Sequence, residues 1–316
     1  MIRIQKILVP VDFSAPSKTA VNYGLSLALE YNARLVLAHI VFPFTTLVYT
    51  FPTESFVFEK EQVEYAKSRM TGLVPAEHSV RVDFETIVKV GELRSELLAI
   101  VDDEQIDLIV MGTHGRNAFN RFLLGSLTER MLRRVRVPIM TVSHLDPAKA
   151  LHNAGPIPLG HILYATDLSD RAEAGLTFSI ELARKTAARL TVLHVLKAVE
   201  AIYGGLEIGF PAGKIDQLRE EALARLTGSV SVQPCEHVRV TPVMREGDTT
   251  REILAYCDER SVDLIVMNLH GKGFIERAIL GSTAERVIRS AHVPVLSIPA
   301  PADKAAPVRI DQQTVA

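Results

Sequence analysis

Short runs of apolar residues alternate with longer amphipathic segments along most of the chain. Runs such as ILVPV and LIVM are apolar throughout, as expected for strands that are buried on both faces of a parallel sheet. The alternation is typical of an α/β fold, in which helices cover both faces of the sheet. In the first half of the chain the apolar runs predict strands near 6–12, 34–41, 81–88, 106–112 and 137–142.

Polar residues mark where the predicted helices begin. Ser14 is a good N-cap for a first helix, and Pro16 fits its first turn, where the missing N–H costs little. Ser169 repeats this cap in the second half. Further helices are predicted near 93–104 and 126–135, with Ser126 as the cap of the latter.

The whole pattern occurs twice. KILVPVDFS at 6–14 matches HILYATDLS at 161–169 with an offset of 155 residues, and 91–115 matches 247–271 with an offset of 156. A repeat of this length predicts two tandem domains, each a five-stranded, Rossmann-like parallel sheet.

The expected domain boundaries follow from the repeat. They are a first domain at 1–143, a linker rich in Pro, Gly and Ala at 144–159, a second domain at 160–299, and a mobile tail at 300–316. The aromatic segment at 41–58 and its glycine-rich counterpart at 196–213 break the symmetry. For the first of these we favour a loop or short helix packed over the sheet edge, with a lid or subunit contact as the alternative.

Composition narrows the classes of protein. The formal charge of −2, from 35 basic and 37 acidic residues, gives no general reason to bind nucleic acid or an anionic membrane. Cys235 and Cys257 form no CxxC pair, so a disulfide framework and a zinc knuckle are not indicated. No apolar stretch reaches the roughly 20 residues of a membrane span, and the N-terminal run is too short for a signal peptide. We expect a cytoplasmic protein.

A glycine pattern follows the fourth predicted strand. The stretch MGTHGRNAFNRFLLGS spaces Gly112, Gly115 and Gly125 and ends with Ser126. Ligands of open parallel sheets bind beyond the carboxyl ends of the strands, and backbone N–H groups at a helix start favour phosphates. Glycine would let the backbone turn sharply and approach such a ligand, and Arg116 adds positive charge nearby.

An aspartate ends the first predicted strand of each repeat, Asp12 in the first half and Asp167 in the second. If the first strand borders the glycine-bearing one, the Asp12 carboxylate can accept hydrogen bonds from a ribose or a base edge. The alternative is a carboxylate that caps its own loop.

These residues resemble the universal stress protein family, whose ATP-binding members carry Gly-x2-Gly-x9-Gly-Ser/Thr after the fourth strand. The resemblance covers about 1–143 and 160–299. It implies ATP as the ligand, with Mg²⁺ as an optional companion. The site residues that it implies, together with Arg116, are Asp12, Ile40, Val41, Gly112, Gly115, Gly125 and Ser126 in the first domain, and Asp167, Val195, Gly271, Gly281 and Ser282 in the second.

The second copy of the motif differs at one position. Asn268 stands where the first copy has Gly112, and its side chain needs room, which favours the first site over the second. In one-domain relatives two chains pair through their last strands. We therefore expect the two halves to pair within one chain, with Pro138 and Pro294 tolerable on such edge strands, and a homodimer stays open.

Catalytic signals are weak. Two histidines of the first half, His39 and His114, have counterparts in the second half, His194 and His270. Their strands are expected to lie about 10 Å apart, too far for one shared metal, so packing is the favoured role. No GxSxG, HExxH or paired carboxylates occur, which predicts binding with at most slow ATP hydrolysis. The leading hypothesis is a nucleotide-binding regulatory or stress-response protein. A nucleotide-free interaction module or, less favoured, an adenylate-forming enzyme is the alternative.

Overall fold

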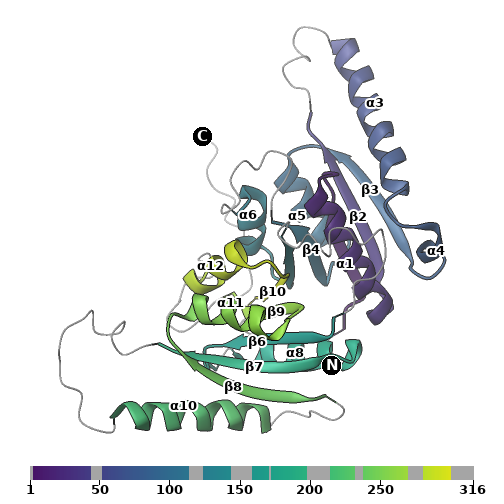
Figure 1. Cartoon of the computed structure of the whole chain (residues 1–316). Coiled ribbons are helices and arrows are strands. Elements are labelled where there is room, and N and C mark those ends of the chain that lie inside the picture. The colour runs from purple at the N-terminus through teal and green to yellow at the C-terminus, as the bar shows by residue number, and fades with distance from the viewer. Residues whose placement is uncertain are drawn as a thin grey trace, which may run out of the picture.

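The computed structural model of the chain describes residues 3–43, 52–113, 124–143, 159–170, 172–197, 214–231, 238–269 and 280–299. Ten strands form one sheet, in the order β3-β2-β1-β4-β5-β10-β9-β6-β7-β8 (Figure 1). Within each half all neighbouring strands are parallel. The predicted α/β class with two five-stranded units is therefore confirmed.

Strands and helices alternate in both halves. The first half contains β1 (Lys6–Pro10), α1 (Ala15–Tyr31), β2 (Arg34–Val41), α3 (Pro52–Thr71), α4 (Ala76–Ser79), β3 (Phe84–Val90), α5 (Leu93–Asp103), β4 (Leu108–Gly112), α6 (Ser126–Arg134) and β5 (Ile139–Val142). The second half contains β6 (His161–Thr166), α8 (Ala172–Thr186), β7 (Arg189–Leu196), α10 (Lys214–Ser231), β8 (Val240–Glu246), α11 (Thr249–Arg260), β9 (Leu264–Asn268), α12 (Ser282–Ser290) and β10 (Val295–Ile298). Every strand predicted in the first half overlaps an observed one.

The first helix begins as its sequence predicts. The Ser14 side chain accepts a hydrogen bond from Ser17 N, and a proline occupies the first turn. The helix ends at Asn32, which has a left-handed φ of 51° and whose backbone N–H bonds Ala28 O. Asparagine tolerates this conformation better than most residues, so both ends of α1 are set locally.

The segment at 41–58 contains the beginning of a long helix. Residues 44–51 lie outside the described part of the chain, but α3 begins at Pro52 and runs to Thr71, well beyond a short helix. Proline at a first helical position is a common start signal, which the aromatic composition obscured. The helix lies along β2 and β3, at the edge of the sheet (Figure 1).

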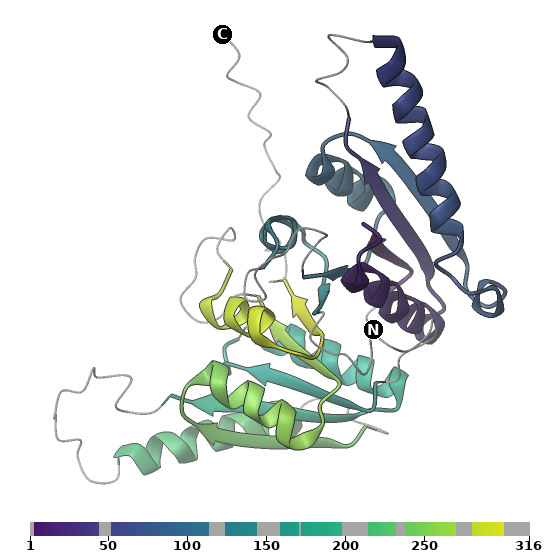
Figure 2. The same cartoon turned by 45° about the horizontal axis from the view of Figure 1, so that its top comes forward.

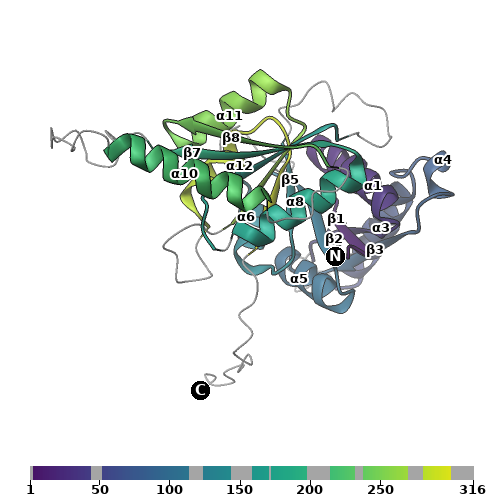
Figure 3. The same cartoon turned by 90° about the horizontal axis from the view of Figure 1, so that it is seen from below.

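The core has one layer on each face of the sheet, because successive strand residues point to opposite faces. Seen from below, α8 and α10 lie on one face and α11 on the other (Figure 3). The layer under α1 and α8 includes Ile7, Leu108, Tyr164 and Leu264. The opposite layer, under α5, α6, α11 and α12, includes Leu8, Ile109, Leu163 and Ile265. Each layer draws residues from both halves of the chain.

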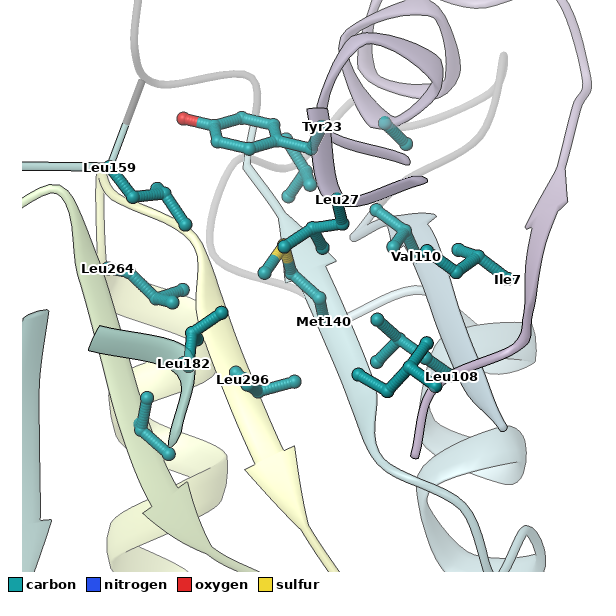
Figure 4. Packing of buried hydrophobic residues seen from close by; sticks show 14 of the residues in the cluster. Ile7, Tyr23, Leu27, Leu108, Val110, Met140, Leu159, Leu182, Leu264 and Leu296 are labelled. Atoms are coloured by element: carbon teal, nitrogen blue, oxygen red, sulfur yellow. The ribbon is translucent and has the colours of Figure 1, made fainter. Parts of the chain in front are cut away.

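The halves meet at the antiparallel pair of β5 and β10. Thr141 lies opposite Val295 and Met140 opposite Leu296, and Thr141 Oγ1 donates to Val295 O at 3.2 Å. Figure 4 shows Leu27 of α1 near Met140 on one side of this seam, with Leu182 of α8 near Leu296 on the other. That the halves pair in this way in solution stays a prediction.

Other expectations fall mainly on residues outside the described part. Of the predicted linker, Leu159 is described and is buried in the core, while 144–158 and the tail at 300–316 lie outside. Within the described residues, no helix combines the length and the apolar character needed to cross a membrane.

A disulfide tests the pairing of the halves. Paired residues of antiparallel strands have Cα atoms about 4.5–5.5 Å apart, within the range a disulfide bridges. In a Cys235→Ser background, Thr141→Cys with Val295→Cys should form a crosslink within one chain under mild oxidation. Mass spectrometry of peptides and non-reducing gels report it. Thr141→Cys alone is the control, and crosslinks only between chains would contradict the intramolecular pair.

Buried His161 predicts a pH effect on stability. The ring is 4% exposed, with Nε2 2.9 Å from Thr191 Oγ1. Burial lowers the pKa of His161, against a smaller raising effect of the Arg260 carbonyl. The unfolded chain therefore takes up this proton first. Stability present above the unfolded pKa of about 6.5 is lost as pH falls toward the lower folded value. His161→Gln should flatten the fall of the melting temperature between pH 7 and 5, and equal slopes would contradict this.

Candidate functional site

A cavity of about 420 Å³ lies at the carboxyl ends of β6, β7 and β9. It is on the face of the sheet that α11 and α12 cover, and Figure 2 shows these two helices side by side there. Its volume is within the range of small-molecule sites, about 300–1,000 Å³. The lining residues are Tyr164, Ala165, Thr166, Asp167, Leu193, His194, Val195, Leu196, Lys197, Thr249, Ile253, Met267, Asn268, Leu269, Gly281, Ser282, Thr283 and Ala284.

Strand order places the cavity. β6 lies between β7 and β9 in the sheet. The chain continues from β6 to β7 on one side and later returns to place β9 on the other side, so the strand order reverses at β6. At such a reversal, the loops after neighbouring strands separate and leave a crevice. β1 lies between β2 and β4 in the same way, which confirms that Asp12 follows a strand bordering the glycine-bearing one.

Apolar side chains form the floor of the cavity. Leu193 and Val195 of β7, Met267 of β9 and Ile253 of α11 are all buried. Polar groups lie around this floor, at the strand ends and at the first turns of α11 and α12. An apolar floor with a few polar groups is the usual construction of a site for a partly aromatic ligand.

Both predicted aspartates close a turn. Asp167 Oδ1 accepts from Ser169 N at 3.0 Å and from Ser169 Oγ at 2.7 Å, and Asp12 Oδ1 accepts in the same way from Ser14. The residue between them is left-handed in each copy, Leu168 with φ 55° and Phe13 with φ 65°. The loop-capping role weighed from sequence is therefore present, and it fixes each carboxylate at the strand end.

Two of the recurring histidines tie strand ends to this turn. His39 Nδ1 lies 2.6 Å from Val11 O, and His194 Nδ1 lies 2.9 Å from Thr166 O. Both contacts agree with a packing role. In the described part of the chain, no group of three His, Cys, Asp or Glu could hold a metal. His114 and His270 lie outside that part.

The start of α12 borders the cavity without a side-chain cap. Its N-cap is Gly281 and its first residue is Ser282, and α6 likewise has Gly125 as N-cap before Ser126. The expectation that Ser126 caps α6 is wrong, because the serine lies one position inside the helix. As a result, no cap side chain occupies the first-turn N–H groups, which carry partial positive charge.

Gly281 at this helix start is needed for the protein's own packing. The sequence had suggested instead that it makes room for a ligand. Gly281 N donates to Leu269 O at 3.0 Å, and a Cβ on Gly281 would lie 2.9 Å from that same oxygen. Gly125 N donates to Thr113 O at 2.9 Å in the first domain. The close approach is therefore made by the protein's own strand end, which holds the helix start over the cavity.

Gly112 also makes room for the protein rather than for a ligand. A Cβ there would lie 2.9 Å from Pro16 Cβ, in the first turn of α1. Gly112 is not among the described glycines with positive φ, so its backbone conformation does not itself require glycine. The first turn of α1 can pack against β4 because Gly112 has no side chain.

Asn268 fits because the facing residue of α8 is Gly175, which has no side chain. Tyr164 Oη, which donates to Ala172 O at 2.6 Å, lies 3.3 Å from Asn268 Oδ1, and a Cβ on Gly175 of α8 would lie 2.0 Å from that oxygen. The position that matches Gly175 in the first domain is Ala20. The Asn268 side chain thus points to α8, on the face opposite α11 and α12.

The predicted residues are only partly described. Topology brings together the ends of β1, β2 and β4 with the start of α6, and so groups Asp12, Ile40, Val41, Gly112, Gly125 and Ser126 at one edge. In the second domain Asp167, Val195, Gly281 and Ser282 all line the cavity. Gly115, Arg116 and Gly271 lie outside the described residues.

Sequence reasoning missed the contribution of α11. Thr249 and Ile253 line the cavity from its first two turns, and Lys197 follows the end of β7. Asp248 caps this helix by accepting from Arg251 N at 2.9 Å. Asp248, an acidic N-cap just after the third strand of the repeat, was the signal in the sequence that could have placed the start of α11 at this edge.

These features define a two-domain α/β protein with a ligand-sized cavity at the carboxyl edge of its sheet. The profile of the universal stress protein family matches residues 3–143 and 158–299, and the chain belongs to this family. It is 26% identical over 302 residues to a universal stress protein of Mycolicibacterium smegmatis, covering 92% of this chain and 96% of that protein.

Two further similarities agree with this. Universal stress protein MJ0531 of Methanocaldococcus jannaschii is 31% identical over 145 residues, covering 44% of this chain and 82% of that protein. The crystal structure of a universal stress protein from Archaeoglobus fulgidus superposes with a TM-score of 0.64 at 22% identity, covering 95% of this chain and 98% of that one. The latter supports the fold.

The Asn268 arrangement predicts a destabilising substitution. Gly175→Ala should lower the free energy of unfolding by about 1–3 kcal/mol, because the new methyl overlaps Asn268 Oδ1 and the Tyr164 ring. Adding Asn268→Gly should restore part of the loss by removing the nearer contact. Urea denaturation measures both variants. A Gly175→Ala protein as stable as the wild type would contradict this packing.

Proposed function

We propose that this protein is a regulatory protein of stress responses that binds an adenine nucleotide, ATP, at the carboxyl edge of each domain. The observation that carries the proposal is the cavity in the second domain, which has an apolar floor, a fixed carboxylate at one strand end and an uncapped helix start. Members of the universal stress protein family bind adenine nucleotides, and the resemblance implies the same ligand here.

Each part of the cavity suits one part of a nucleotide. The floor of Leu193, Val195 and Met267 suits the base, which is apolar on its faces. The Asp167 carboxylate is positioned to accept a hydrogen bond from a ribose hydroxyl or a base amino group. The first turn of α12, with the Ser282 hydroxyl, suits the phosphates.

The first domain has the equivalent parts. Asp12 follows β1, Ile40 and Val41 end β2, and Ser126 begins α6. This copy also keeps the complete glycine spacing, including Gly115 with Arg116 beside it. We propose that it is the stronger site, and that the second site binds as well because the Asn268 side chain is directed to α8.

Binding without fast turnover fits the described side chains. Asp167 already accepts two hydrogen bonds from Ser169, and His194 Nδ1 contacts a backbone oxygen. These contacts join each group to the protein's own turn at the strand ends. Slow hydrolysis of ATP, with Mg²⁺ held by the phosphates, is compatible with this arrangement.

Aspartate substitutions at the two helix starts test the proposal. Ser126→Asp and Ser282→Asp place a negative charge where phosphates would bind, while the charge suits the helix dipole and should not lower stability. Each variant should lose the ATP binding of its own domain in calorimetry, and the double variant should lose both. Removing one or two charge-assisted hydrogen bonds predicts a loss of about tenfold or more per site.

Ser68→Asp, on an exposed position of α3, is the control for the added charge. It should bind ATP as the wild type does. If the purified wild-type protein releases no nucleotide on denaturation and gives no heat with ATP, the nucleotide-free interaction module replaces this proposal. Binding that both aspartate variants leave unchanged would place the nucleotide elsewhere.

A further inference from the structure

A second cavity, of about 510 Å³, lies in the first domain, at the end of the sheet opposite to the carboxyl ends of the strands. It is bounded by the chain before β1, the C-terminal end of α1, the start of β2 and the chain before β3. Its lining is Arg3, Ile4, Gln5, Ala28, Tyr31, Asn32, Ala33, Arg34, Arg81, Val82 and Asp83. Because it lies at the amino ends of the strands, it is separate from the proposed nucleotide sites. We call it the arginine pocket, after Arg3, Arg34 and Arg81.

Backbone hydrogen bonds hold the walls of the arginine pocket together. Arg34 N donates to Gln5 O at 2.7 Å, and Leu35 N donates to Asp83 O at 2.8 Å. The Ala28 carbonyl at the end of α1 accepts from both Asn32 N and Ala33 N. These bonds fix three separate chain segments around one space and satisfy a helix carbonyl that would otherwise oppose an anion.

Among the residues that line this space, three arginines stand against one carboxylate, Asp83. Arg34 Nε lies 3.3 Å from Asp83 Oδ2, and Arg34 Nη2 lies 3.2 Å from Glu85 Oε2, so this guanidinium is held in place by two carboxylates. Arg3 and Arg81 are exposed, and the described residues provide no ion-pair partner for either. Guanidinium groups bind phosphate and carboxylate through paired N–H donors.

The second domain lacks this combination, although its backbone is arranged in the same way. Arg189 occupies the place of Arg34, but its Nη2 donates to Arg260 O at 3.0 Å. Thr186 stands in the place of Tyr31, and Arg239 in the place of Asp83. The pocket is thus a property of the first domain and is not dictated by the fold.

We propose that the arginine pocket is a second ligand site, which binds a compact phosphate-bearing molecule through the guanidinium groups of Arg3 and Arg81. Arg34, held by its two carboxylates, orients the neighbouring wall. The site is independent of the nucleotide sites, since it lies at the other end of the strands. A phosphorylated small molecule bound there would stabilise the first domain by binding its folded state.

Calorimetry with inorganic pyrophosphate on the full chain tests this proposal. The Ser126→Asp/Ser282→Asp protein should still bind pyrophosphate, because the helix starts are not involved. Arg3→Gln with Arg81→Gln should weaken binding by about tenfold or more, as expected for loss of two charge-assisted hydrogen bonds.

Arg239→Gln is the matched control, since it removes one positive charge at the same edge of the second domain. It should bind pyrophosphate as the wild type does. No heat at millimolar pyrophosphate, or unchanged affinity in Arg3→Gln/Arg81→Gln, would overturn the proposal. Loss of binding in Ser126→Asp/Ser282→Asp would overturn it too, by assigning the heat to the nucleotide sites.

Discussion

The reversal of chain direction around β1 and β6 determines where a crevice forms at the carboxyl edge of the sheet. β1 lies between its parallel neighbours β2 and β4, and β6 lies between β7 and β9. In each domain the chain first adds a strand on one side of the central strand and later adds one on the other side. The loops at the carboxyl ends therefore diverge, and the first turn of the last helix in each domain is left facing the gap. The aspartate turn and the histidine contact that follow are local consequences, because both connect the ends of strands that the reversal has made adjacent.

The antiparallel contact of β5 with β10 converts two such sheets into one. Strands that would be edges become central, so their backbone groups are paired and their side chains extend both core layers across the chain. The first-half and second-half sites lie on the same continuous sheet, and each sits four strands or fewer from the seam. The strand ends at both proposed sites therefore belong to one framework that the two domains share.

Much of the fold could be predicted from sequence, because strand burial and helix starts are local signals. The apolar runs located every strand of the first half, and Ser14 with Pro16 located α1. The extent of α3 could not be predicted, since its signal is one proline in an aromatic segment. At the site, the positions of Asp12 and Gly281 followed from the repeat, and the loop-capping role of Asp12 was one of the two alternatives, but the reason for Gly281 was not predicted. Gly112 and Gly281 make room for Pro16 and Leu269 O, contacts between distant segments that only the folded chain brings together.

The contact between Asn268 of β9 and Gly175 of α8 limits how the sequences of the two domains can differ. With alanine at position 175, as Ala20 has in the first domain, an asparagine at 268 would meet a methyl group at its amide oxygen. Loss of the helix methyl is tolerable alone, whereas gain of the asparagine alone is not. The two positions are therefore coupled: glycine at 175 is the condition under which position 268 can carry a polar side chain beside Tyr164.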